Sequence, residues 1–241
     1  MQNIHIGTSG WHYRHWKGPF YPQDLSKSGF LHYYAERLDT VEVNRSFFRL
    51  PSREVLRRWR DTVKAGFVFT IKASRYITHT KKLKDAGEPL HALLESVKPL
   101  GEKLGPILFQ MPLRWRLDAD RFYDFLEALP RDFRFAFELR HPSWHITEVY
   151  DAMTEMGVAL CIGEVNGTMS PKVITSDFVY VRLHGPGGSS EGYSTEALSG
   201  WAGAFSAWAD QGREIFCYFD NDESAHAARD AVKLKAMMEK E

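Results

Sequence analysis

The sequence TVEVNRSFFRLPSREVLRRWRDTVKAGFVFTIK (residues 40–72) contains a complete strand–helix–strand unit. Two β-rich runs, residues 40–44 and 67–72, enclose a segment whose apolar residues recur at helical spacing. Those apolar residues are Val55, Leu56, Trp59 and Val63. Ser52 precedes the segment, and serine at this position is typical of a helix N-cap. A helix between two short strands predicts a parallel pair joined by a crossover connection.

The same alternation continues along the chain. The β-rich runs are residues 4–8, 40–44, 67–72, 107–110, 134–139, 158–162, 178–184 and 215–219. Apolar residues recur at helical spacing in residues 31–38, 55–63, 90–97 and 122–129. Asp118 is the expected N-cap of the last of these helices. A further helix is expected after Ser194 or Thr195. Eight such units predict an α/β fold: a single (β/α)8 TIM-type barrel domain over residues 1–241, with eight parallel strands and outer helices.

An open, doubly wound sheet is the alternative architecture. That fold would place a glycine fingerprint for a dinucleotide after the first strand. Here the first strand continues into GTSGWHY (residues 7–13), whose two glycines lack the dinucleotide spacing. The barrel is therefore favoured.

Composition excludes several broader classes of protein. The chain is 44% hydrophobic and 26% charged, which is typical of a globular domain and not of a disordered or collagen-like chain. Its 31 Lys and Arg balance 31 Asp and Glu, so net charge gives no reason to expect nucleic acid or an anionic membrane as the main partner. No pattern predicts an oligomeric state.

The expected location is the cytoplasm. The first residues, MQNIHIGTSGW, lack the basic start and apolar core of a secretory signal. No run approaches the roughly 20 apolar residues of a membrane span. Cys161 and Cys217 each lie in an apolar run, which predicts buried thiols in a reducing compartment and not a disulfide or a metal site.

Polar residues concentrate where the predicted strands end, and in a barrel this end carries the functional site. They are Thr8 and Ser9; Glu42 and Asn44; Lys72; Gln110; Glu138 and Arg140; Glu164 and Asn166; Arg182 and His184; and Asp220 and Asn221. Alternate residues of a strand share a face, so Glu138 points with Arg140 and Arg182 points with His184. The alternative is structural: ion pairs that close the top of the barrel, Glu138 with Arg140 and Glu42 with Arg182.

A glycine-rich loop and several aromatic residues adjoin these ends. The loop at residues 184–193 includes Gly187 and Gly188, whose backbone amides could bind an anion such as phosphate. A surface loop without a ligand is equally compatible with this composition. Trp11, Tyr13 and Trp144 could stack on a sugar or a base, although core packing is the commoner use of an aromatic ring.

Seven ordered blocks of the sequence resemble the YecE-like family, domain of unknown function 72. They are GTSGWHYRHWKGPFYP (7–22), TVEVNRSFF (40–48), FVFTIKASRYITH (67–79), LGPILFQMP (104–112), AFELRHPSW (136–144), FVYVRLHG (178–185) and IFCYFDND (215–222). The resemblance implies a TIM-barrel-like fold, with weaker similarity to the sugar-isomerase and endonuclease barrels, and implies no particular activity. The recurrent polar residues that it implies fall on Trp11, Glu42, Asn44, Lys72, His79, Gln110, Glu138, Arg140, Trp144, Arg182, His184 and Asn221. Asp220 replaces the first of an asparagine pair of the family, which adds a carboxylate.

Mixed charge at the mouth favours acid–base catalysis without a metal. We expect Glu42 or Glu138 to act as the acid or base, His184 to titrate near neutral pH, and Lys72 to steady an anion or form a Schiff base. The predicted substrate-binding residues are Trp11, Tyr13, Asn44, Gln110, Arg140, Trp144, Arg182, Gly187, Gly188, Asp220 and Asn221. The hypothesis is an enzyme, a hydrolase, lyase or isomerase, that acts on a small sugar-phosphate or nucleotide-like substrate.

Two alternatives remain beside this hypothesis. No cofactor is predicted, but Glu42, Glu138, His184 and Asp220 are donors that a divalent metal accepts, opposed by the neighbouring cations. A non-catalytic or processing protein could instead bind single-stranded nucleic acid, with Lys72, Arg140 and Arg182 on phosphates and Trp11 or Trp144 on a base. The arginines of the second helix are expected to form its solvated face; they are Arg53, Arg57, Arg58 and Arg60.

Overall fold

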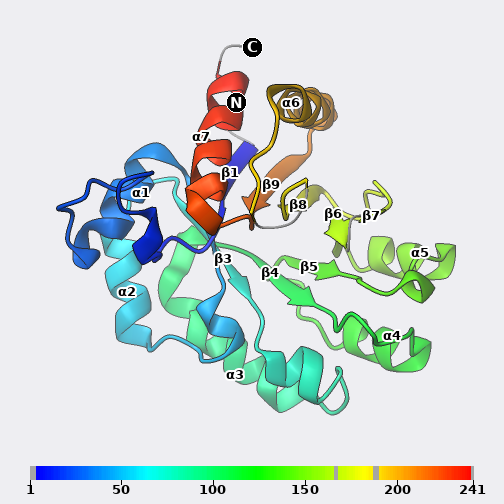
Figure 1. Ribbon diagram of the computed structural model, residues 1–241. Helices are drawn as coiled ribbons and strands as arrows, with labels where there is room; N and C mark the ends of the chain where they lie inside the picture. The colour runs from blue at the N-terminus through cyan, green and yellow to red at the C-terminus, as the bar shows by residue number, and fades with distance from the viewer. Residues whose placement is uncertain (1–3, 166–167, 187–189, 240–241) are drawn as a thin grey trace.

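The computed structural model describes residues 4–165, 168–186 and 190–239, and its strands form a closed barrel (Figure 1). The barrel strands within these residues are β1 (Ile4–Ser9), β2 (Thr40–Val43), β3 (Val68–Lys72), β4 (Leu104–Gln110), β5 (Phe135–Glu138), β6 (Ala159–Val165), β8 (Phe178–Leu183) and β9 (Glu214–Phe219). They pair in parallel in the order β5-β4-β3-β2-β1-β9-β8-β6, and pairing of β5 with β6 closes the ring. The eight-stranded parallel barrel predicted from the sequence is confirmed. A two-residue strand, β7 (Thr168–Met169), pairs antiparallel with β6 and was not predicted.

Helices surround the barrel. They are α1 (Phe30–Arg37), α2 (Arg53–Thr62), α3 (Gly87–Val97), α4 (Ala119–Glu127), α5 (Thr147–Glu155), α6 (Thr195–Asp210) and α7 (His226–Met238). The three N-caps predicted from the sequence are confirmed: Ser52, Asp118 and Ser194 accept hydrogen bonds from the third backbone amide that follows, at 3.2–3.4 Å. None of the helices in the described part of the chain is long and apolar enough to cross a membrane.

Helices α5 and α7 were not predicted. The buried face of α7 consists largely of alanines, Ala227, Ala228 and Ala231, so it has few of the large apolar residues by which helical spacing is detected. Helix α5 buries only Val149 and Met153, which is too few for a repeating pattern. Both helices depend on packing against the barrel more than on a distinctive apolar stripe.

The interior of the barrel changes from apolar to polar along its axis. One cluster of buried side chains inside the ring includes Leu108, Cys161, Phe178, Phe216 and Tyr218. The Tyr218 hydroxyl lies 2.8 Å from the hydroxyl of Thr40, the first residue of β2. Both cysteines are buried and free, as predicted. The Tyr218 hydroxyl therefore adds a polar contact to an otherwise largely apolar cluster inside the barrel.

Strand register brings polar side chains together at the mouth. Ser9 of β1 is paired with Glu42 of β2, and Gln110 of β4 is paired with Glu138 of β5. Paired residues of neighbouring parallel strands lie side by side, so each carboxylate receives a polar neighbour from the adjacent strand. The mouth is thus set by the hydrogen-bonding pattern of the sheet.

Close approach of β1 to β2 gives a test of this packing. A Cβ atom on Gly7 would lie 2.0 Å from the Thr40 carbonyl oxygen, whereas one on Gly200, in α6, would meet nothing within 4 Å. We expect Gly7→Ala to lower the free energy of unfolding by about 3 kcal/mol or more. Gly200→Ala should raise it by about 0.5–1 kcal/mol, because alanine restricts the unfolded chain and favours helix. Urea denaturation measures both values, and a Gly7→Ala protein as stable as the wild type would contradict the strand contact.

Candidate functional site

Arg182, near the end of β8, is the centre of the barrel mouth. Its side chain is fully buried. Nε and Nη2 donate to the two oxygens of Glu42 at 3.1 and 2.9 Å, Nη1 donates to Glu138 Oε2 at 2.8 Å, and Nη2 donates to Asp220 Oδ2 at 2.9 Å. Burial alone would lower the pKa of Arg182, but the three carboxylates raise it well above its usual value. The guanidinium is therefore permanently charged.

This geometry bears on the role predicted for Arg182. Nη1 also lies 3.4 Å from His184 Nε2, and Nη2 lies 3.3 Å from Ser9 Oγ. A guanidinium has five N–H donors, and four of them donate to carboxylate oxygens here. Arg182 is fully buried, and four of its donors are held by carboxylates, so its role as a direct contact to a substrate anion stays a prediction. The predicted ion pair with Glu42 is present.

Glu42 is held by the same cluster. In addition to Arg182, its oxygens accept from the Tyr180 hydroxyl at 2.6 Å and from the Ser9 hydroxyl at 2.9 Å. The side chain is fully buried, with both oxygens occupied. Glu42 is consequently placed to anchor Arg182 and not to touch a ligand.

Glu138, at the end of β5, has two oxygens in different environments. Oε2 accepts from Gln110 Nε2 and from Arg182 Nη1, both at 2.8 Å. Oε1 is buried and accepts no hydrogen bond from the described residues; the nearest cation is Arg140 Nε at 3.4 Å. Burial raises the pKa of Glu138, but Arg182, His184 and Arg140 outweigh it and hold the pKa below its usual value. Glu138 is therefore an ionised carboxylate with one oxygen unsatisfied.

His184 lies between two carboxylates. Its Nδ1 is 3.1 Å from Asp220 Oδ2, and its Nε2 is 3.9 Å from Glu138 Oε1. Burial raises the pKa of Asp220, but the Arg182 guanidinium and the hydrogen bond with His184 depress it well below its usual range. An ionised Asp220 fixes the proton of a neutral His184 on Nδ1, which leaves Nε2 as an acceptor that faces Arg182 and Glu138.

Lys72, at the end of β3, is a cation without a carboxylate partner. No ion pair within 4.0 Å of Nζ occurs in the described ranges, and Nζ lies 4.9 Å from the centre of the Phe47 ring. Burial, followed by the charge of Arg182, lowers the pKa of Lys72. His79 lies beside it, and burial together with Lys72 and Arg75 lowers the pKa of that imidazole. Lys72 and the partly exposed Arg140 are the cations available to a ligand at the mouth.

The predicted aromatic residues lie in the core more than at the mouth. Trp144 is fully buried, packs against Trp115 and Phe122, and donates its indole N–H to the Trp115 carbonyl at 2.8 Å. Trp11 is 7% exposed and packs edge-on against Trp59. Neither ring presents an open face to the mouth. The nucleic-acid alternative, which placed Lys72, Arg140 and Arg182 on phosphates and Trp11 or Trp144 on a base, stays a prediction.

Three further predicted residues border the mouth. The Tyr13 hydroxyl donates to the Ser9 carbonyl at 2.7 Å, and Asn44 Oδ1 is buried without a partner in the described structure. Asn221 is buried and donates to the Glu191 carbonyl at 2.8 Å and to Asp230 at 3.1 Å, so it anchors the chain before α6. Gly187, Gly188 and Asn166 lie outside the described residues.

Some residues of the cluster were missed by the sequence analysis. Tyr180 lies in the middle of an apolar strand, where a tyrosine is indistinguishable from a core aromatic residue. Ser9 was noted as a strand end but not as a partner of Glu42. Within the described ranges, no group of three or more His, Cys, Asp or Glu has an arrangement that could hold a metal ion.

The fold and the mouth together define a TIM-type α/β barrel protein with a buried ionic cluster at the carboxyl ends of its strands. The chain belongs to the family described as protein of unknown function DUF72, whose model matches residues 5–241. A DUF72 family protein from Thermotoga maritima MSB8 has a similar structure, with a TM-score of 0.87 and 27% identity over 98% of this chain and 99% of that one. A DUF72 family protein from Enterococcus faecalis V583, 20% identical over 98% of this chain and 95% of that one, has a TM-score of 0.83 and supports the fold.

Sequence similarity extends to a curated relative. The UPF0759 protein YecE of Escherichia coli (strain K12) is 30% identical over 115 residues. The match spans 47% of this chain and 42% of that protein, so the two are alike over less than half of either length. These comparisons establish family and fold.

The central role of Arg182 can be tested by stability. Removing one partner of a buried ionic cluster leaves uncompensated charge, which typically costs about 3–5 kcal/mol. We expect Arg182→Gln to lose at least about 3 kcal/mol in urea denaturation at neutral pH. Arg140→Gln, which removes a partly exposed neighbour, should lose about 1 kcal/mol or less. Similar small losses in both variants would refute the structural role of Arg182.

Acid should weaken the fold through Asp220 and Glu138. Both pKa values are depressed in the folded protein, so the stability from these groups is present above about pH 4, where unfolded carboxylates ionise, and is lost as pH falls toward the folded pKa values. Each group contributes a slope of up to about 1.4 kcal/mol per pH unit. We measure the free energy of unfolding by urea denaturation at several pH values between pH 7 and pH 3. In Asp220→Asn we expect this free energy to depend less steeply on pH, by up to about 1.4 kcal/mol per pH unit, because one titrating carboxylate is gone. Asp24→Asn, at an exposed aspartate, is the control and should leave the slope unchanged.

Proposed function

We propose that the barrel mouth is the active site of an enzyme that transfers a proton on a small anionic substrate, a sugar phosphate or nucleotide-like molecule, in a hydrolase, lyase or isomerase reaction. The observation that carries this proposal is the pair of acceptors formed by Glu138 Oε1 and His184 Nε2, 3.9 Å apart. We place this chemistry in the cytoplasm, because the buried free thiols of Cys161 and Cys217 suit a reducing compartment.

Two acceptors at this separation favour a proton donor near both of them. A substrate hydroxyl or an acidic C–H group that enters the mouth would satisfy the unoccupied oxygen of Glu138. Glu138 is a weak base because its pKa is depressed, so its suitable task is to orient the substrate. His184 is the group we assign to proton transfer, because Asp220 holds its Nδ1 and its Nε2 lies toward Glu138 Oε1.

Asp220 positions His184. The hydrogen bond at Nδ1 fixes the ring and stabilises the imidazolium that forms when Nε2 takes a proton. This carboxylate is the one that replaces an asparagine in the family pattern described above. It is a positioning residue in the proposal, because it acts through His184.

Lys72 and Arg140 provide the positive charge of the site. Lys72 has no ion pair in the described chain, and Arg140 approaches Glu138 without a hydrogen bond. Both can therefore contact an anionic group of the substrate or steady negative charge that develops during proton transfer. The lowered pKa of Lys72 also suits a Schiff base with a carbonyl substrate, which is the second route open to this residue. Arg182 and Glu42 hold this arrangement from below.

Proton transfer can be tested directly. The protein is incubated in D2O with a panel of aldose, ketose and nucleoside phosphates, and NMR follows deuterium incorporation, new sugar signals and released phosphate. We expect turnover of at least one member, reduced about 100-fold or more in His184→Asn and Glu138→Gln. Arg131→Gln, at the opposite end of the barrel, is the control and should keep the wild-type rate.

Each outcome bears on a specific part of the proposal. A panel that shows no exchange, isomerisation or hydrolysis at millimolar substrate would reject this reaction and substrate class. Turnover that persists in His184→Asn would remove His184 as the proton carrier. Thermal unfolding of each variant shows whether a lost rate reflects lost chemistry or a lost fold.

A further inference from the structure

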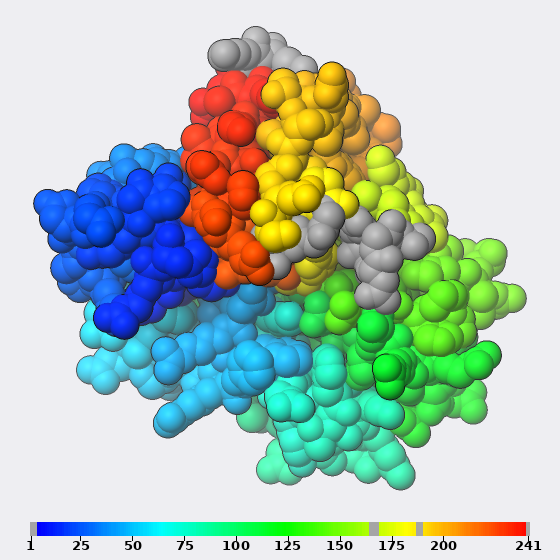
Figure 2. Space-filling view, in the orientation of Figure 1, coloured from blue at the N-terminus to red at the C-terminus, as the bar shows by residue number. Residues whose placement is uncertain are grey.

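A separate cavity of about 680 Å³ lies beside the mouth, between α1, α2 and the segments that follow β1 and β2. On the face drawn in Figure 2, the dark-blue chain after β1 lies next to the light-blue chain after β2. Cavities that bind small molecules typically measure about 300–1,000 Å³, so this one has the size of a ligand site. Tyr13 and Asn44 form its wall toward the mouth.

The charged lining of this cavity is exclusively basic. Lys27, Arg45, Arg58 and His12 line it, and no aspartate or glutamate does. Across the described ranges, Lys27, Arg45 and Arg58 form no ion pair within 4.0 Å, in a chain whose net charge is zero. Burial, followed by the charges of Lys27 and Arg45, lowers the pKa of His12, which indicates that both cations act on the same space.

The remaining wall is aromatic and apolar. Trp59 is half-buried and meets the edge of Trp11 with ring centres 4.8 Å apart, and Leu31 lies on the α1 side. Asn44 Oδ1 is buried and has no hydrogen-bond partner in the described structure. Lys27, Arg45 and Arg58 are exposed at the rim of this cavity. A buried acceptor without a donor, next to a tryptophan and three unpaired cations, is a combination that a ligand can satisfy.

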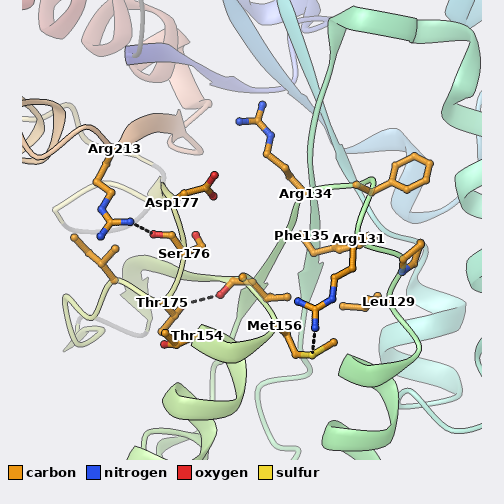
Figure 3. Close-up of a pocket in the computed structure, with 15 residues that line it drawn as sticks. Leu129, Arg131, Arg134, Phe135, Thr154, Met156, Thr175, Ser176, Asp177 and Arg213 are labelled. Atoms are coloured by element: carbon orange, nitrogen blue, oxygen red, sulfur yellow. Dashed lines mark hydrogen bonds between the residues drawn. The ribbon is translucent and has the colours of Figure 1, made fainter.

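A second cavity, at the opposite end of the barrel, shows the contrast. It measures about 490 Å³ and is also lined by arginines, Arg131, Arg134 and Arg213. These are engaged with protein: Arg131 with Met156, Arg134 with Glu214, and Arg213 with the Ser176 carbonyl. In Figure 3 the guanidinium groups of Arg131 and Arg213 point apart, each toward its own partner. The three arginines of that cavity make contacts within the protein, and they do not converge on one point as free cations.

We propose that the cavity between α1 and α2 binds an organic phosphate that carries a planar ring, a nucleoside monophosphate. The phosphate contacts Arg45, Arg58 and Lys27, because guanidinium groups bind phosphate oxygens with paired N–H donors. The base lies against Trp59, and a hydroxyl or amino group of the nucleoside donates to Asn44 Oδ1. This site is independent of proton transfer at the mouth and stands whether or not the mouth is catalytic.

The test is a titration with adenosine 5′-monophosphate, followed by tryptophan fluorescence and by calorimetry. We expect saturable binding to the wild type, weakened about 10-fold or more by Arg45→Gln and by Arg58→Gln, since one charge-assisted contact amounts to roughly 1.4 kcal/mol. Arg57→Gln is the matched control, because Arg57 is an exposed arginine of the same helix that does not line the cavity, and it should change affinity less than 2-fold.

Two further probes separate the parts of the proposal. Ribose 5-phosphate has the phosphate but lacks the base. It should bind at least about 10-fold more weakly than the nucleotide if the contact of the base with Trp59 contributes as much as one phosphate contact. Titration of Glu138→Gln shows whether the nucleotide binds at the mouth instead, because Glu138 lies there. Absence of binding at millimolar nucleotide, or equal affinity in Arg45→Gln, Arg58→Gln and the wild type, would overturn the proposal. Binding lost in Glu138→Gln but kept in Arg58→Gln would place the nucleotide at the mouth and also overturn it.

Discussion

The buried guanidinium of Arg182 is the constraint on which the barrel mouth depends. Burying an isolated charge costs far more than a domain can supply, so Arg182 requires carboxylates within hydrogen-bond distance on several sides. They come from β2, β5 and the end of β9, strands that lie far apart in sequence. Only a closed ring brings these strands around one point. The ionic cluster and the closure of the barrel are therefore mutually dependent.

This constraint divides the polar residues of the mouth into two groups. Glu42 accepts from Arg182, Ser9 and Tyr180, and Arg182 also donates to Glu138 and Asp220, so Glu42 and Arg182 form a rigid floor. The second group faces the mouth. Glu138 belongs to both groups, because its Oε2 is part of the floor and its Oε1 faces the mouth without a partner among the described residues. A carboxylate held at one end and free at the other is oriented without being neutralised, which is the form of preorganisation that acid–base sites use.

The sequence predicted the barrel well because strand ends, helix caps and alternation are local features. The runs at residues 178–184 and 215–219 match β8 and β9 closely, and the caps at Ser52 and Ser194 follow from their own next few residues. The burial of Arg182 and Trp144 could not be predicted in the same way, because it depends on partners 29 to 140 positions distant. A one-dimensional pattern shows that a residue lies at a strand end, but not whether that end faces solvent or other charges.

The net charge of zero gives little information about local binding sites, because opposite charges that cancel over the whole chain can still lie in different places. At the mouth the charges of Lys72, Arg140 and Arg182 balance those of Glu42, Glu138 and Asp220, so an anion there would be held by individual cations and not by a net positive charge. Attraction must come from cations that lack a partner: Lys72 within the mouth, and Lys27, Arg45 and Arg58 in the neighbouring cavity. Arg45 directly follows Asn44, and Arg58 lies on α2. The arginines of α2 were expected to form its solvated face. Because unpaired charge at a partly enclosed surface interacts more strongly than charge in open water, the proposed nucleotide cavity would add a second anion site beside the contacts that we propose for Lys72 and Arg140 at the mouth.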